Sequence, residues 1–179
     1  EQGFGDFILY SRFFNDLPFK ANNFTVLTHQ KIKCLFERTF PKIKFITEIN
    51  SEKIDQHVPI GDLAKFYINS FDDIKKRSEA YIAVDKVRKQ KIKQLLPQGK
   101  KICGISWISK NESLGINKSM TLEDMKELLL LPDIEFVDLQ YTDTSKERSE
   151  FKKKYGVEIL KINEIDNFYD LDGLASLID

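Results

Sequence analysis

The start of the chain places an acidic side chain directly after two glycines. The sequence runs Gly3-Phe4-Gly5-Asp6 and continues into the apolar residues 7–10. Glycines let a chain reverse and approach a ligand closely, and the N–H groups of the following helix then point at that ligand. In such a loop the Asp6 carboxylate is a candidate general base that accepts a proton from an attacking hydroxyl group. The alternative is structural: an acid at a helix start caps its free N–H groups.

A second group of residues with reactive or hydrogen-bonding side chains lies at the end of the expected strand 101–107 and in the loop after it. It contains hydroxyl, indole and ammonium groups, from Ser106, Trp107, Ser109, Lys110 and Lys118. Open α/β folds bind ligands at the carboxyl edge of a parallel sheet, where such a loop would lie. A lysine at this edge neutralises the charge that grows on a departing diphosphate. The alternative is an exposed loop whose lysines only keep the protein in solution.

Gln140 directly follows another expected strand, residues 134–139, and we expect it to face the same sheet edge. A ligand contact is one interpretation of Gln140, whereas residues 141–143 beside it are ordinary turn residues. The chain contains no Walker A sequence, and Gly3 and Gly5 lack the third glycine of the dinucleotide-binding fingerprint.

Composition narrows the class of protein. Hydrophobic residues make up 41% of the 179 residues, including 14 phenylalanines, which is enough for a core, and the formal net charge is zero. We therefore expect no nucleic-acid partner, and the basic stretch 86–93 is interpreted as a solvated helix face. Cys34 and Cys103 have no metal-ligand spacing, and neither have His29 and His57, so we expect reduced thiols, no metal, no cofactor and a cytoplasmic location. No apolar run approaches the ~20 residues of a membrane span.

The pattern of apolar residues predicts two incomplete α/β units in series. The first has expected helices at 7–17, around 32–36 and at 59–67, and strands at 24–27 and 43–46, so that a strand before residue 1 is missing. The segment Pro97-Gln98-Gly99-Lys100 is the clearest interruption, and we place the domain boundary there, between lobes 1–97 and 98–179. A basic helix at 84–96 closes the first lobe.

The second lobe repeats the alternation of strand and helix. We expect strands at 101–107, 134–139 and 157–160, and helices at 122–131, 145–155 and 171–178. Thr121 and Asp124 form a capping-box pattern, and Gly156 is expected to end the helix before it. The predicted fold class is thus α/β, with parallel sheets flanked by helices.

Several segments, taken in order, resemble a known family. They are EQGFGDFILYSRFF, TVLTHQKIKCLFERTFP, GDLAKFY, KICGISWISKN, KSMTLEDMKELLLLPDIEFVDLQY and YDLDGLASLID. Together they cover nearly the whole chain and resemble the glycosyltransferase-like region found C-terminal to tetratricopeptide repeats in bacterial proteins. That region is similar to the ADP-heptose:lipopolysaccharide heptosyltransferases and, more distantly, to the O-linked N-acetylglucosamine transferases.

This resemblance implies a GT-B architecture of two incomplete Rossmann-like units, with the acceptor bound by the first and a nucleotide-diphosphate sugar by the second. It implies that Asp6 is the catalytic base, with Gly3 and Gly5 in the acceptor loop. Ser106, Trp107, Lys110, Lys118 and Gln140 would bind the donor. The acceptor would be a protein or a glycan.

Other interpretations of the chain stay open. Because the resemblance implies that a first strand and half of the donor lobe are absent, we expect these 179 residues to be a piece of a longer protein and inactive by themselves. A noncatalytic interaction module of a tetratricopeptide-repeat protein is the alternative function. A sheet without its first strand would expose an unpaired edge, so we also expect either a rearranged first lobe or a homodimer.

Overall fold

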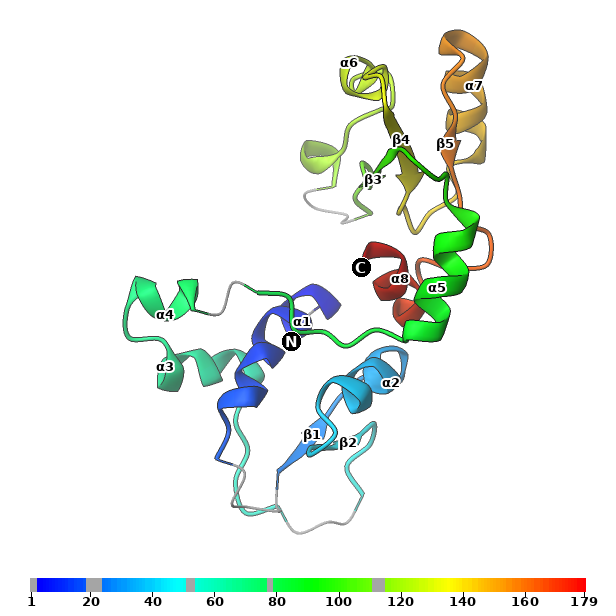
Figure 1. The fold of residues 1–179 in the computed structure, drawn as a ribbon. Helices are drawn as coiled ribbons and strands as arrows, with labels where there is room; N and C mark the ends of the chain where they lie inside the picture. Colours follow the sequence, from blue (N-terminus) through cyan, green and yellow to red (C-terminus); the bar gives the residue numbers. More distant parts are fainter. Residues whose placement is uncertain (1–2, 19–23, 51–53, 77–78, 111–114) are drawn as a thin grey trace. The chain divides into compact units, whose positions relative to one another are not determined.

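The structure is a computed structural model, and it describes residues 3–18, 24–50, 54–76, 79–110 and 115–179. The protein is mixed α/β, with two small parallel sheets flanked by helices (Figure 1). It divides into two compact units, Glu1–Val84 and Asp85–Asp179, each of which is described by itself. The predicted coarse fold class, α/β with parallel sheets and flanking helices, is therefore confirmed.

The first unit surrounds a two-stranded parallel sheet. Its elements in chain order are α1 (Phe4–Ser11), the 3-10 helix η1 (Arg12–Asp16), β1 (Thr25–Leu27), α2 (Gln30–Thr39), β2 (Lys44–Ile46), η2 (Ile60–Leu63), α3 (Ala64–Tyr67) and α4 (Phe71–Lys75). The strands pair in register from Thr25 opposite Lys44. Four phenylalanines, Phe14, Phe36, Phe40 and Phe45, are buried with their ring centroids 5.2–6.5 Å apart. Aromatic burial therefore supplies much of this core.

The second unit is a three-stranded parallel sheet in the order β3-β4-β5, with helices on both faces. Its elements are α5 (Lys86–Leu95), β3 (Lys101–Ile105), η3 (Ile116–Lys118), α6 (Lys126–Leu129), β4 (Ile134–Asp138), α7 (Ser145–Tyr155), β5 (Ile159–Leu160) and α8 (Leu171–Ile178).

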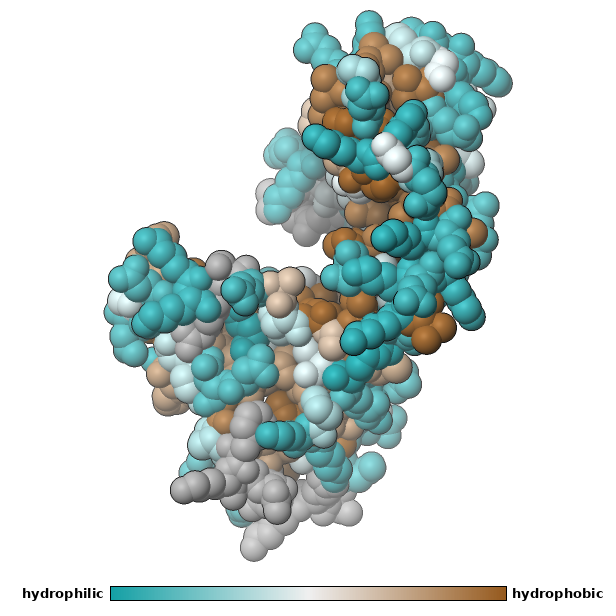
Figure 2. Space-filling view, in the orientation of Figure 1, coloured by the Kyte–Doolittle hydropathy of each residue, from teal (hydrophilic) through white to brown (hydrophobic). Residues whose placement is uncertain are grey.

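Alternation along β4 and β5 supplies both cores of this unit. Phe136 and Ile159 pack with side chains of α6 and α7, whereas Val137 and Leu160 pack with those of α5 and α8. Figure 2 shows hydrophilic side chains over the visible surfaces of α5 and α7. This arrangement leaves the carboxyl ends of the strands to be covered by loops.

Several sequence-based boundaries differ from the structure, and two of these differences change an expected site or lobe. Helix α1 begins at Phe4 rather than Phe7, and Gly3 is its N-cap with extended backbone at φ −146°. The helix placed in the first lobe by the expected boundary at 97/98, α5, packs against α8 inside the second unit. Its apolar Ile92 joins the core there, so burial rather than the Pro-Gly interruption decides which unit it belongs to.

Hydrogen bonds attach the segment just before α5 to the rest of the first unit. The Tyr81 hydroxyl donates to the carbonyl of Ile8 and lies 2.9 Å from Ser11 Oγ. The N–H of Ala83 donates to Thr39 Oγ1 at 3.0 Å. Burial raises the pKa of the Tyr81 phenol above its ordinary value near 10, and the bond to Ser11 offsets this shift in part.

This shift predicts a loss of stability in alkali. The folded state keeps the Tyr81 proton to a higher pH than the unfolded state, so the free energy of unfolding should fall as the pH rises above about 10. Urea unfolding followed by circular dichroism between about pH 8 and 11 measures this slope. Tyr81→Phe should flatten it. An unchanged slope in Tyr81→Phe would contradict the assignment.

A second prediction concerns the contact between α5 and α8. Arg88 Nη1 donates to Asp170 Oδ1 at 2.8 Å, and its Nη2 pairs with the other carboxylate oxygen. A methyl group on Gly173 would meet Asp170 Oδ2 and would lie 2.5 Å from Arg88 Nη2 and 2.7 Å from Arg88 Cζ, so it would touch both partners of this ion pair. Gly173→Ala should therefore displace the guanidinium and lower the free energy of unfolding by about 1–3 kcal/mol.

The control for this prediction is the Arg88→Ala background, in which the guanidinium is absent and the Asp170 carboxylate is no longer held by its partner. The cost of Gly173→Ala should be smaller there, and urea titrations followed by Trp107 fluorescence give both values. Equal costs in the two backgrounds would show that Arg88 is not the obstacle.

Candidate functional site

A buried glutamine joins the loops that leave β3 and β4. Gln140 has no exposed surface, and its Oε1 accepts hydrogen bonds from Ser106 Oγ at 2.9 Å and from the backbone N–H groups of Trp107 and Ile108, both at 3.1 Å. Its Nε2 donates to the carbonyl of Ile108 at 2.7 Å. The structure therefore brings three of the expected donor-binding residues together at the sheet edge. Both polar atoms of the Gln140 side-chain amide take part in holding this backbone.

Trp107 is likewise held in the interior. It is 4% exposed, packs among the apolar side chains of α6 and α7, and donates from Nε1 to Glu147 Oε2 at 3.0 Å. The other oxygen of Glu147 accepts from the N–H of Leu122 at 2.8 Å. Trp107 and Glu147 thus position the loop between β3 and α6.

The two expected lysines lie on this loop and are exposed. Ser119 Oγ accepts from the N–H of Ser109 at 2.9 Å and donates to the carbonyl of Gly115 at 2.7 Å, which closes the base of the loop. The backbone N–H of Lys110 donates to the hydroxyl of Tyr141 at 2.9 Å. In the part of the chain that the structure describes, which excludes loop residues 111–114, no acidic side chain pairs with Lys110 or Lys118.

Asp138, at the end of β4, forms a buried ion cluster that the sequence analysis missed. Its side chain is fully buried and lies 3.2 Å from Arg148 Nε and 3.5 Å from Lys161 Nζ. It also accepts hydrogen bonds from the hydroxyl of Thr144 and from the backbone N–H of Gln140. An acid at the end of the strand, directly after the apolar pair Phe136-Val137, was the signal in the sequence. With this many partners, the carboxylate fixes the surrounding loops rather than presenting a reactive group.

Three aromatic residues beside this cluster were also missed as site candidates. Tyr141, Phe168 and Tyr169 are 41%, 44% and 66% exposed. Tyr141 follows Gln140, and the other two precede α8. The signal available in the sequence was the pair of adjacent aromatics at 168–169, next to Asp and Asn turn residues.

The residues expected to form the acceptor loop lie in the first unit. Gly5 and Asp6 are in the first turn of α1, and Asp6 is exposed and makes no side-chain cap. A Cβ added at Gly5 would meet no atom within 4 Å. The predicted glycine loop is therefore wrong, because helix α1 already includes Gly5. A carboxylate in the first helical turn still has a favourable interaction with the helix dipole.

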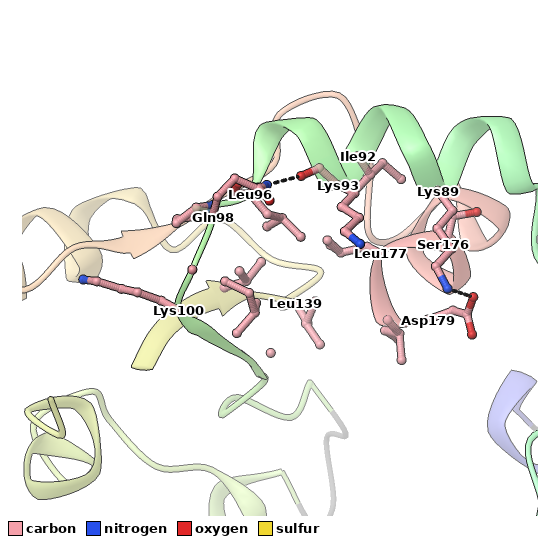
Figure 3. A pocket seen from close by; sticks show the side chains of 16 residues that line it. Lys89, Ile92, Lys93, Leu96, Gln98, Lys100, Leu139, Ser176, Leu177 and Asp179 are labelled. Carbon is pink, nitrogen blue, oxygen red and sulfur yellow. Dashed lines mark hydrogen bonds and ion pairs between the residues drawn. The ribbon is translucent and has the colours of Figure 1, made fainter. Parts of the chain in front are cut away.

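A hollow of about 540 Å³ lies elsewhere in the second unit, between α5, α8 and the face of β3 (Figure 3). Its apolar lining includes Ile92, Leu139 and Leu177, and Lys89 at its rim bonds Asp179 at 2.5 Å. None of the expected site residues lines it.

Among the described residues, no group of three or more His, Cys, Asp or Glu side chains is placed to hold a metal ion. The described helices also include none that is long and apolar enough to cross a membrane.

The chain is similar to the Protein FlbA of Caulobacter vibrioides (strain ATCC 19089 / CIP 103742 / CB 15), with 28% identity over 203 aligned positions. The similarity takes in 99% of this chain and 33% of FlbA, so the chain spans about a third of the length of that relative. No family model matches the chain. No solved structure matches it either. The function is therefore argued from the residues at the sheet edge.

The role given to Gln140 leads to a direct test. Gln140→Ala would leave the N–H groups of Trp107 and Ile108 and the carbonyl of Ile108 without their partner, so it should cost about 2–4 kcal/mol of unfolding free energy. Ser106→Ala removes a single donor to the same oxygen and should cost about 1 kcal/mol. Urea unfolding gives both values.

Fluorescence gives a second measure of the same role. Trp107 is the single tryptophan of the sequence, and its emission should shift to longer wavelength in Gln140→Ala as the loop opens. Wild-type emission together with wild-type stability in this variant would refute the positioning role of Gln140.

Proposed function

We propose that the chain is the acceptor-side unit and part of the donor-side unit of a GT-B-type glycosyltransferase that uses a nucleotide-diphosphate sugar. The observation that carries the proposal is the pair of exposed lysines, Lys110 and Lys118, on the loop that leaves the carboxyl end of β3. Cations that pair with no acidic side chain among the described residues suit an anionic ligand at this edge. The ordered parallel sheet beneath them, with helices on both faces, supports the same interpretation.

In the proposed reaction the acceptor hydroxyl oxygen attacks the anomeric carbon of the donor sugar. Its proton passes to the Asp6 carboxylate, and the bond from the anomeric carbon to the phosphate oxygen breaks with its electron pair on the diphosphate. Lys110 and Lys118 stabilise the negative charge that develops there. Ser106, Trp107 and Gln140 act indirectly, because their hydrogen bonds set the course of the loop that carries the lysines.

The test uses the natural protein that contains this chain. Calorimetric titration with UDP-, GDP- and ADP-sugars should detect binding of one of them, and Lys118→Ala should weaken it by about tenfold. Lys153→Ala, which removes an exposed lysine from α7 of the same unit, is the matched control and should leave the affinity unchanged.

The catalytic role is tested separately by Asp6→Asn. This variant should bind the donor normally and lose about 10²–10⁴-fold in kcat, as expected when a general base is removed. Asp55→Asn, another exposed acid of the first unit, should have wild-type activity. If none of the three donors binds and Asp6→Asn changes nothing, the proposed function is wrong.

A further inference from the structure

The three aromatic rings at the sheet edge form one continuous group. The ring centroids of Tyr141 and Phe168 are 5.9 Å apart with their planes inclined by 34°, and those of Phe168 and Tyr169 are 4.8 Å apart and nearly perpendicular. All three side chains keep more than a third of their surface exposed. Exposed aromatic surface is unfavourable in water, so an arrangement that maintains it calls for an explanation.

Hydrogen bonds fix the backbone that carries two of these rings, Phe168 and Tyr169. Asn167 is 7% exposed, and its Nδ2 donates to the carbonyls of Asp138 and Gln140, both at 3.2 Å. Asp166 Oδ1 accepts from the N–H groups of Phe168 and Tyr169 at 2.8 and 2.9 Å. These bonds tie the turn to the end of β4, so that the aromatic group is preformed rather than collapsed into the core.

The third ring is connected to the lysine loop. The hydroxyl of Tyr141 accepts from the backbone N–H of Lys110 at 2.9 Å. This hydrogen bond places a flat apolar surface directly beside the loop that carries exposed ammonium groups. A ligand that matches both features has a flat aromatic ring at one end and a negative charge at the other, which describes a nucleotide better than it describes a neutral sugar.

We propose that Tyr141, Phe168 and Tyr169 form a stacking surface for the heteroaromatic base of a nucleotide. The inference rests on the proposed function, since it assigns the base of the donor to three residues outside the predicted donor-binding set. Stacking tolerates different bases because each has a π face, so this surface contributes affinity rather than choice among bases.

Saturation-transfer NMR on the 179-residue chain tests the surface with the 5′-monophosphates of adenosine, uridine, guanosine and cytidine, and with methyl β-glucoside. At a Kd of about 1 mM, the base protons should receive more saturation than the ribose protons, and the glucoside should receive none. Phe168→Leu keeps an apolar side chain without a ring, and Tyr169→Ala removes the most exposed ring. Each should weaken nucleotide binding by about tenfold.

The matched control is Phe71→Ala, which removes a 70% exposed ring from the first unit and should leave binding unchanged. Unaltered Trp107 emission in Phe168→Leu and Tyr169→Ala shows that the second unit is folded. The inference is overturned if no nucleotide binds, if the glucoside binds as well as the nucleotides, or if Phe71→Ala causes the same loss.

Enzyme kinetics on the natural protein separate this inference from the proposed function. Sugar transfer with an unchanged KM for the donor in Tyr169→Ala would refute the stacking surface and leave the transferase. Nucleotide stacking that depends on Tyr169, in a protein that transfers sugar from none of the UDP-, GDP- or ADP-donors, would support the surface and refute the transferase.

Discussion

The second unit depends on two buried polar side chains at the carboxyl end of β4. Asp138 and Gln140 have no exposed surface, and such groups are tolerated in an interior only when their hydrogen-bonding capacity is met. Asp138 forms ion pairs with Arg148 and Lys161 and accepts a hydrogen bond from Thr144. Gln140 forms hydrogen bonds with the backbone after β3. The loops after β3, β4 and β5 are therefore fixed by one requirement, which is that neither group can be left unpaired.

The alternation of side chains along β4 explains where these groups lie. Phe136, Asp138 and Gln140 occupy alternate positions, so the face that is apolar under α6 and α7 becomes polar toward the carboxyl edge. Val137 and Leu139, between them, stay with the apolar cluster of α5 and α8. The centre of β4 thus packs in an apolar core on both faces. Its carboxyl end provides the buried junction, which is formed by Asp138 and Gln140.

The sequence predicts those parts of this unit that depend on neighbouring residues. The helix Ser145–Tyr155 and its end at Gly156, with φ +73°, follow from local pattern and from the left-handed conformation that glycine accepts. The reciprocal bonds between Thr121 and Asp124 likewise match a local rule. Local sequence pattern gave wrong predictions where contacts between residues far apart in the sequence determine the structure.

The assignment of α5 is one such failure. It belongs to the second unit because it packs on α8, which follows it by more than 70 residues. The same reason limits prediction of the site. Ser106, Trp107 and Gln140 were expected at the correct edge, but their residue types cannot reveal that they bond one another across two strands instead of facing a ligand.

The groups that remain for a ligand are those that extend beyond the buried junction. Lys110 is joined to it through the hydroxyl of Tyr141, and Phe168 and Tyr169 through the buried amide of Asn167, so hydrogen bonds tie the backbone of these groups to the junction. Preorganisation of this kind reduces the conformational entropy lost on binding. If the proposed nucleotide binds here, two effects of substitution at this edge are separable: changes to the buried junction would alter stability and affinity together, whereas changes to the exposed lysines and rings would alter affinity alone.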